Sequence, residues 1–264
     1  MKEINYTEIY KQFQEGSVLI AGPCAVESEE QINRLARKMK EIGIKFFRAG
    51  AFKPRTSPKT FQGLGIEGSK LIKKAAIKNE LYVVSEIMDN GEIENCYDLI
   101  DVIQIGSRSM ASYGFLKQIG KATAKDRKPV LIKRGFNATL QELLFAAEYI
   151  TNEGNPNVIL CLRGIRTFEQ IDSSMRFTPD LASIIELKEK TKFPVLFDPS
   201  HSSGDSRYVE RLAKAALLLG SDGLLIEVHD KPEKALSDGM QAIKPDVLKN
   251  IIEFNNSLIL SHQN

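Results

Sequence analysis

The sequence predicts an α/β protein with a single-domain (β/α)8 TIM-barrel fold, and three observations support this. Eight short apolar runs recur along the 264 residues, amphipathic helical patterns separate them, and no linker divides the chain. About 250 residues is the usual size of such a barrel. We therefore expect residues 1–264 to form one domain, with residues 1–16 as a short N-terminal extension. A doubly wound open sheet is the alternative fold.

The eight apolar runs have the composition of strands that are buried on both faces. They are nearly continuous in Val, Ile, Leu and Phe rather than alternating with polar residues, which is typical of parallel sheets covered by helices. The runs are 17–22, 45–50, 81–87, 102–107, 129–135, 157–164, 194–200 and 223–229.

Helical patterns with capping signals lie between these runs. The segment 28–43 begins with Ser28 and ends at Gly43, which are residue types favoured at helix ends, and it places apolar residues on one face. Segments 139–154 and 205–220 repeat the same design. The alternation of strand and helix favours a parallel sheet with helical crossovers.

The composition indicates a globular protein of the cytoplasm and argues against several other classes. The formal net charge is only +2, with 36 basic and 34 acidic residues, so no nucleic-acid partner is expected. The N-terminus lacks the apolar core of a signal peptide, and no apolar run is long enough to span a membrane. Three scattered cysteines fit a reducing compartment better than a disulfide scaffold.

Every predicted strand ends in an ionisable or metal-binding side chain. Active sites of these barrels lie at the C-terminal ends of the strands. In chain order the side chains are Cys24, Arg48, Glu86, Arg108, Lys133, Arg163, Asp198 with His201, and Glu227. Strand ends near solvent explain some of these charges. Charges flanked by apolar residues, such as Glu227, are costly without a partner or ligand, so we expect a functional site at this face.

Three of these positions and one nearby residue form a mixed sulfur, nitrogen and oxygen donor set. Cys24, His201, Glu227 and the nearby Asp238 suit a divalent transition metal, and their strands adjoin when a barrel closes. A buried cysteine that only fills the core is the alternative reading of Cys24.

A second subset is cationic and indicates an anionic ligand. Its members are Arg48, Lys53, Arg55, Arg108, Lys133 and Arg163. Some of them should pair with acids such as Glu86 and Asp198, yet the cations outnumber these acids. Guanidinium groups match phosphate and carboxylate oxygens, so the ligand should carry more than one such group.

Seven motifs resemble those of 3-deoxy-D-arabino-heptulosonate 7-phosphate (DAHP) synthase, in its short type Iβ form. They run in order over residues 21–239 as AGPCAVES, KPRTSP, IQIGSRSM, PVLIKRG, LCLRGIRTF, DPSHSSG and IEVHDKPEKALSDG. The resemblance implies a (β/α)8 barrel that condenses phosphoenolpyruvate with erythrose 4-phosphate and releases phosphate, the first step of the shikimate pathway.

The resemblance also implies roles for individual residues. One divalent metal ion, which the sequence does not identify among Mn, Fe, Co and Zn, would be held by Cys24, His201, Glu227 and Asp238. Phosphoenolpyruvate would meet Arg48, Lys53, Arg108, Lys133 and Arg163, with Ser107 near its phosphate and Glu86 and Asp198 in the same substrate site. Erythrose 4-phosphate would meet Arg55 and Thr56. Lys133, Cys24 and His201 are the expected catalytic residues, Lys133 for a proton.

Two alternative functions and two further expectations remain. The related 3-deoxy-D-manno-octulosonate 8-phosphate synthases use arabinose 5-phosphate, but their loop resembles KANR rather than KPRT, and their metal-independent members carry Asn at the position of Cys24. A non-catalytic phosphate-binding barrel would lack a ligand or cation of the set, and none is missing. We also expect no regulatory domain before the first strand, and a homo-oligomer, either dimer or tetramer.

Overall fold

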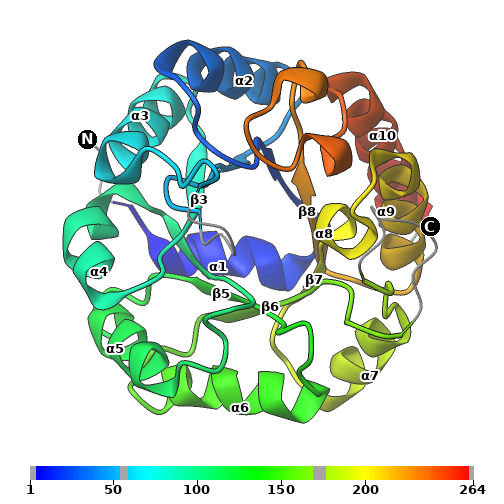
Figure 1. Cartoon of the computed structure of the whole chain (residues 1–264). Helices are drawn as coiled ribbons and strands as arrows, with labels where there is room; N and C mark the ends of the chain where they lie inside the picture. The colour runs from blue at the N-terminus through cyan, green and yellow to red at the C-terminus, as the bar shows by residue number, and fades with distance from the viewer. Residues whose placement is uncertain (1–3, 54–58, 169–176, 262–264) are drawn as a thin grey trace.

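The computed structural model describes residues 4–53, 59–168 and 177–261, and it confirms the predicted barrel. Eight parallel strands close in the order β1 to β8, with β1 paired to both β2 and β8. Figure 1 shows the helices as an outer ring around these strands. The strands are β1 (Val18–Gly22), β2 (Phe46–Arg48), β3 (Tyr82–Glu86), β4 (Val102–Ile105), β5 (Val130–Lys133), β6 (Val158–Leu162), β7 (Val195–Phe197) and β8 (Gly223–Glu227).

The helices lie where the capping signals place them. Ser28 accepts a hydrogen bond from the Gln31 amide, and Thr139 forms a capping box with Glu142. The α-helices are α1 (Tyr6–Glu15), α2 (Glu29–Glu41), α3 (Gly65–Lys78), α4 (Asn90–Cys96), α5 (Tyr113–Thr123), α6 (Leu140–Thr151), α7 (Ala182–Lys190), α8 (Pro199–Ser203), α9 (Ser206–Leu218) and α10 (Pro245–Ser261). Among the described residues, no helix combines the length and hydrophobicity needed to cross a membrane.

Two apolar cores hold the barrel together. One lies between the strands and the helix ring and includes Ile32, Leu35 and Met39 of α2. The other fills the barrel interior and includes Ile20 of β1 and Leu131 of β5, from opposite sides of the barrel. Because both faces of each strand are covered, nearly every strand residue is buried, as the continuous apolar runs predict.

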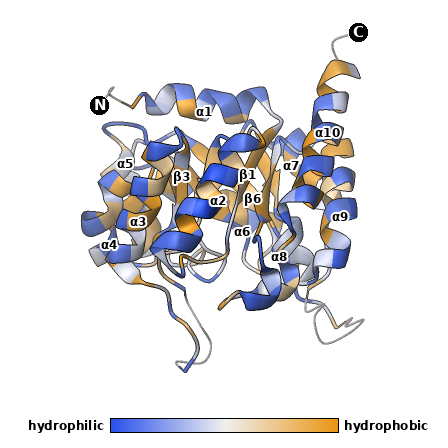
Figure 2. Cartoon of the chain, turned by 90° about the horizontal axis from the view of Figure 1, so that it is seen from above, coloured by the Kyte–Doolittle hydropathy of each residue, from blue (hydrophilic) through white to orange (hydrophobic). Residues whose placement is uncertain are grey.

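Helix α1 closes one end of the barrel, which the sequence analysis did not predict. It lies across that end in both views, whereas α8 lies toward the other end (Figure 2). Phe13 is fully buried against Phe46, with ring centroids 4.8 Å apart, and the Tyr10 hydroxyl donates to the Val158 carbonyl at 3.1 Å. The described part of the predicted extension therefore contributes to the interior core through α1.

A buried lysine lies beneath the same end of the barrel. Lys128 is fully buried, and its ammonium donates to the Ile100 carbonyl at 2.9 Å and lies 3.6 Å from the centroid of the Tyr97 ring. Tyr6 of α1 covers it from the other side, with 4.9 Å between the ammonium and the ring centroid. Burial lowers the pKa of Lys128 to about 8.

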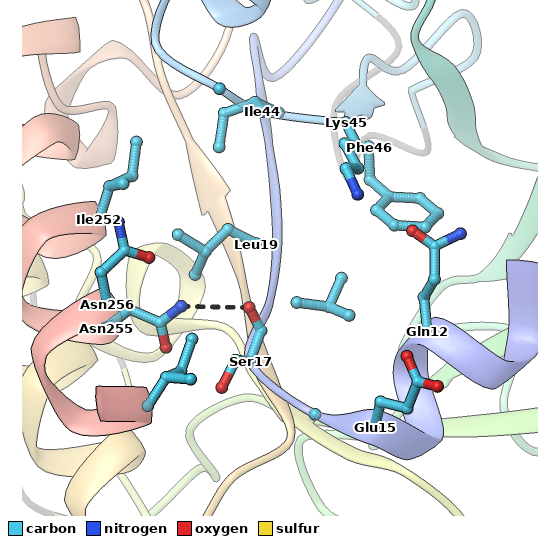
Figure 3. Close-up of a pocket in the computed structure, with 14 residues that line it drawn as sticks. Gln12, Glu15, Ser17, Leu19, Ile44, Lys45, Phe46, Ile252, Asn255 and Asn256 are labelled. Atoms are coloured by element: carbon cyan, nitrogen blue, oxygen red, sulfur yellow. Dashed lines mark hydrogen bonds between the residues drawn. The ribbon is translucent and has the colours of Figure 1, made fainter. Parts of the chain in front are cut away.

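A cavity of about 340 Å³ opens at this end, beside α1 and α10. Figure 3 shows Leu19 and Phe46 among its lining residues, with Asn255 donating to the Ser17 carbonyl. Figure 2 shows α1 and the end of α10 on this same side of the molecule. The side chains expected at the site belong to the opposite end, where the strands finish.

Candidate active site

The C-terminal end of β1 delivers Cys24 to the centre of this face. Gly22 ends the strand, and a Cβ atom there would lie 2.1 Å from the Arg48 carbonyl oxygen. Glycine therefore allows the chain to pass close to β2 before it turns at Pro23. Because β1 pairs with β8 in register from Val18 to Gly22, Cys24 follows the strand directly beside Glu227.

Cys24, Glu227 and Asp238 form a compact group of possible metal ligands. One ligand atom from each lies within 4.8 Å of the others. The Cys24 thiol donates to Asp238 at 3.0 Å and lies 3.0 Å from the hydroxyl of Ser237. The predicted fourth ligand, His201, borders the group, with its Nε2 atom 3.4 Å from Glu227 Oε1. The structure thus brings three of the four predicted ligands together, and His201 lies outside that group, beside Glu227.

Lys53 lies against this group from the loop after β2. Its ammonium donates to Cys24 Sγ at 2.9 Å and lies 4.0 Å from Asp238 Oδ2. Burial raises the pKa of the Cys24 thiol to about 12, and Glu227 adds to the effect. For Lys53, burial disfavours the charge, but Cys24 and Glu227 outweigh it and raise the pKa. The group therefore attracts positive charge strongly.

Glu227 is fully buried and is held by partners from three elements. The Arg48 guanidinium donates to Oε1 at 2.7 Å, and the Gln241 amide donates to Oε2 at 2.6 Å. The backbone N–H of Glu227 donates to the Ser200 hydroxyl at 2.9 Å. Burial works against ionisation, yet His201 and Arg48 keep the pKa of Glu227 below its usual value.

The sequence analysis did not foresee two of these contacts. It assigned Arg48 to an anionic substrate and did not consider Glu227 as its partner, and it did not select Gln241. In the structure Arg48 is 4% exposed and also donates to the Pro23 carbonyl at 3.0 Å. Its Nε atom is buried and has no hydrogen-bond partner among the described residues, so one donor of Arg48 remains for a ligand.

Lys133, Asp198 and His201 form a second buried cluster across the barrel. The Lys133 ammonium donates to Asp198 Oδ2, and His201 Nδ1 lies 2.7 Å from the same oxygen. Asp198 also caps α8 by accepting from the His201 amide at 2.8 Å. Although burial opposes it, the contacts with His201 and Lys133 hold the pKa of Asp198 well below its usual range.

The hydrogen bonds of His201 define which of its nitrogen atoms can bind a cation. Burial, together with Lys133, lowers the pKa of His201 despite its acidic neighbours, so the ring is neutral at pH 7. A proton on Nδ1, directed at Asp198, leaves the Nε2 lone pair on the side of Glu227. A carboxylate that orients a metal-binding imidazole in this way is common in metal sites.

The remaining cations lie toward the mouth of the barrel. Arg163 is 8% exposed, and its guanidinium donates to the His201 carbonyl at 3.0 Å. Arg108 is exposed and lies beside Phe136, which the sequence analysis did not select. The Ser107 hydroxyl is buried and has no partner among the described residues, so it marks a place where a ligand can bind.

Glu86 lies at the end of β3 and depends on a glycine of the next strand end. A Cβ atom at Gly106 would lie 1.9 Å from Glu86 Oε1, and the Gln104 amide donates to Oε2 at 3.2 Å. Two predicted residues, Arg55 and Thr56, lie outside the described residues.

The fold and this site together define a (β/α)8-barrel enzyme class. Thiol, imidazole and carboxylate groups that suit a divalent metal adjoin Lys53, Arg48, Lys133 and Arg163, which suit an anionic substrate.

Comparison with known proteins assigns this barrel to a family. The model of the DAHP synthetase I family matches residues 7–260, so the chain belongs to that family. It is 43% identical over 235 residues to the phospho-2-dehydro-3-deoxyheptonate aldolase of Thermotoga maritima, covering 89% of this chain and 68% of that protein. It is 32% identical over 272 residues to the 2-dehydro-3-deoxyphosphooctonate aldolase of Geotalea uraniireducens, covering 96% of each.

Solved structures give the same result. The crystal structure of the Thermotoga maritima DAHP synthase superposes with a TM-score of 0.87 at 41% identity, over 93% of this chain and 70% of that one. A truncated form of that synthase gives a TM-score of 0.83 at 38% identity, with 93% and 87% coverage.

Proposed function

We propose that the protein is a DAHP synthase, which joins phosphoenolpyruvate to erythrose 4-phosphate with water and releases DAHP and phosphate. C3 of phosphoenolpyruvate forms a bond to the aldehyde carbon, water adds to C2, and the C2–O bond to phosphate breaks. This reaction needs a group that polarises the aldehyde and cations that hold the phosphate and carboxylate.

The observation that carries the proposal is that the possible metal ligands and the cations lie at the same end of the barrel. Ligand atoms of Cys24, Glu227 and Asp238 lie within 4.8 Å of one another. The cation Lys53 contacts Cys24 and Asp238 directly. The likeness of 43% to the Thermotoga relative supports the same reaction.

A divalent metal ion fits the donor set at this position. Cys24, His201, Glu227 and Asp238 would hold it, and the combination of one sulfur, one imidazole and two carboxylates suits Mn, Fe, Co or Zn rather than Mg or Ca. When bound, such an ion supplies a Lewis acid for the aldehyde oxygen.

The protein's own cations bind and orient phosphoenolpyruvate. Arg163 and Lys133 come from neighbouring strands β6 and β5, and both are nearly buried, so their attraction for an anion is only weakly screened by water. Arg48 and Ser107 contribute the donors that the described residues leave open. Lys133 is also the proton-transfer candidate, because its ammonium is already hydrogen-bonded to Asp198.

The second candidate function is condensation with arabinose 5-phosphate. The octulosonate aldolase relatives favour it, since one covers 96% of the chain at 32% identity. The KPRTSP motif at 53–58 and the higher identity to the heptonate aldolase favour the four-carbon aldose.

An aldose-specificity assay with metal add-back tests the proposal. Chelator-treated protein is supplied with phosphoenolpyruvate, one aldose phosphate and one divalent metal, and consumption of phosphoenolpyruvate is followed by its ultraviolet absorbance. We expect turnover with erythrose 4-phosphate only after metal is restored. Equal or faster turnover with arabinose 5-phosphate would reverse the substrate assignment. Full turnover in the presence of chelator would show that the reaction needs no metal ion.

The proposal includes a homo-oligomer, dimer or tetramer, and the cytoplasmic location that the scattered cysteines indicate. Light scattering of the purified protein measures the oligomeric state, and a monomer would contradict the first expectation.

A further inference from the structure

A carboxylate from the loop after β1 contacts the loop after β8, which carries Asp238. Glu27 Oε1 accepts a hydrogen bond from the Leu236 backbone N–H at 2.8 Å. Glu27 is not a member of the possible ligand group, and the mechanism above gives it no role. Because Leu236 stands two residues before Asp238, this hydrogen bond restrains the backbone that leads directly into a predicted metal ligand.

The backbone of Asp238 adopts a conformation that needs support from its surroundings. Its φ and ψ are 53° and 31°, in the left-handed region that residues with a Cβ atom seldom occupy. Such a residue keeps its conformation where contacts around it outweigh the cost. On one side, the Asp238 carbonyl accepts from the Gln241 backbone N–H at 3.2 Å. On the other side, the Leu236 side chain is 58% exposed, so the hydrogen bond to Glu27 contributes more there than apolar burial does.

The segment 236–238 lies against the thiol of Cys24. The Ser237 hydroxyl and Asp238 Oδ2 are each 3.0 Å from Cys24 Sγ. Cys24 and Ser237 are both 3% exposed. A displacement of this segment would therefore remove two contacts of the thiol at once and would separate Asp238 from the other possible ligands.

Glu27 is itself held in place by buried neighbours. Its backbone N–H donates to Gln31 Oε1 at 3.2 Å, and Gln31 Nε2 donates to the Ala25 carbonyl at 3.1 Å, so Gln31 stabilises the turn between β1 and α2. His229 lies behind the carboxylate, with its Nε2 atom 3.8 Å from Glu27 Oε2. Gln31 and His229 are both buried, which leaves the Glu27 side chain little freedom to move away from the loop.

We propose that Glu27 is a positioning residue for the metal site. Its hydrogen bond to Leu236 keeps Ser237 and Asp238 against Cys24, and it thereby determines how well the thiol is covered and how tightly the site binds a divalent cation. Glu27 acts through the backbone of the loop and does not touch the ion. The effect on metal affinity rests on the proposed function, whereas the position of the loop over Cys24 does not.

Alkylation of the metal-free protein tests the position of the loop. Chelator-treated full-length chain is exposed to iodoacetamide, and peptide mass spectrometry follows the rate at Cys24. The rates at Cys96 and Cys161, which are fully buried, correct for global unfolding in the same sample. Glu27→Ala removes the acceptor of the Leu236 N–H, whereas Glu27→Gln keeps a carbonyl oxygen at that place.

The matched control is Glu30→Ala, because the Glu30 side chain is 90% exposed on α2. We expect Glu27→Ala to react at Cys24 roughly three- to tenfold faster than the wild type, which is the effect of losing one hydrogen bond. Glu27→Gln and Glu30→Ala should react at the wild-type rate.

Titration with Co²⁺ tests the consequence for metal binding. We expect Glu27→Ala to bind Co²⁺ roughly tenfold more weakly, as is usual when a residue that orients a metal ligand is removed, and Glu27→Gln to restore most of the affinity. The charge-transfer absorption of a thiolate bound to Co²⁺ reports separately whether Cys24 is a ligand in each variant.

The outcomes separate this inference from the proposed function. Alkylation of Glu27→Ala at the wild-type rate would refute the inference. Equal effects in Glu27→Gln and Glu27→Ala would also refute it, because the charge of Glu27 rather than its hydrogen bond would then be responsible. If the wild type binds no Co²⁺ while Glu27→Ala still exposes Cys24, the metal of the proposed function is refuted and the role of Glu27 in holding the loop stands.

Discussion

Replacing either member of the buried Arg48–Glu227 pair should destabilise the barrel, and by unequal amounts. The two side chains are 5% and 0% exposed, and their atoms lie 2.7 Å apart. Removing one charge leaves the other in a medium of low polarity, and the cost depends on the partners that remain. The structure provides different numbers of partners to the two residues.

Glu227→Met leaves Arg48 with one strong contact, the Pro23 carbonyl at 3.0 Å, and with its Nε atom still unpartnered. A buried charge left this way costs about 3–5 kcal/mol. Arg48→Met leaves Glu227 with the Gln241 amide at 2.6 Å and with the nearby charge of Lys53. Because these partners compensate the carboxylate, the cost should be about 1–3 kcal/mol.

Urea unfolding of chelator-treated protein measures the two costs. The chelator is necessary because a metal bound through Glu227 would add its own binding free energy to the wild type. Glu30→Met and Arg37→Met, both on the surface of α2, are the controls and should change the free energy of unfolding by about 0.5 kcal/mol or less. An Arg48→Met variant that is as unstable as Glu227→Met would refute this reasoning.

Three further predictions concern other parts of the molecule. Cys24→Ala should lose bound metal and activity together while remaining folded, as metal analysis and circular dichroism would show. Unchanged metal content would mean that Cys24 only packs in the core and is no metal ligand. Gly106→Ala should displace the carboxylate of Glu86 and raise KM for a substrate with little loss of stability, whereas unchanged kinetics would separate Glu86 from the site. For Lys128, the folded pKa of about 8 lies below the ordinary 10.5, so between these values the unfolded state holds a proton that the folded state has released. The free energy of unfolding of the wild type, relative to Lys128→Met, should therefore rise by about 2 kcal/mol from pH 8 to pH 10, and a constant difference would contradict the burial of a charged lysine.

The sequence predicted most of the barrel because parallel strands bury both faces. Each apolar run became a strand, with ends shifted by a few residues, and the side chains at the strand ends converge as expected. Residues whose partners lie on distant loops were harder to predict. The pairing of Arg48 with Glu227 depends on how β1 and β2 close against β8, and periodicity within one strand contains no information about that closure.

Helix α1 and the ring of Phe136 escaped prediction for related reasons. The α1 segment is mostly polar, and its few apolar residues are buried only because they fill the open end of the barrel. Nothing within the segment itself indicates that end. Phe136 stands in a loop, where no repeating pattern identifies the side chains that lie at the mouth of the barrel. Gln241 was overlooked because a neutral amide near a strand end gives no charge signal.

The position of the chain ends has a practical consequence for attaching the protein to a surface. The start of α1 and the end of α10 lie on the side opposite the catalytic mouth. Immobilisation through either end should therefore leave the mouth facing the solution, with free access for substrates. A label on either end would likewise report on tumbling of the whole barrel without obstructing the reaction. Attachment through the exposed residues of the β6 loop, such as Phe168, would have the opposite effect.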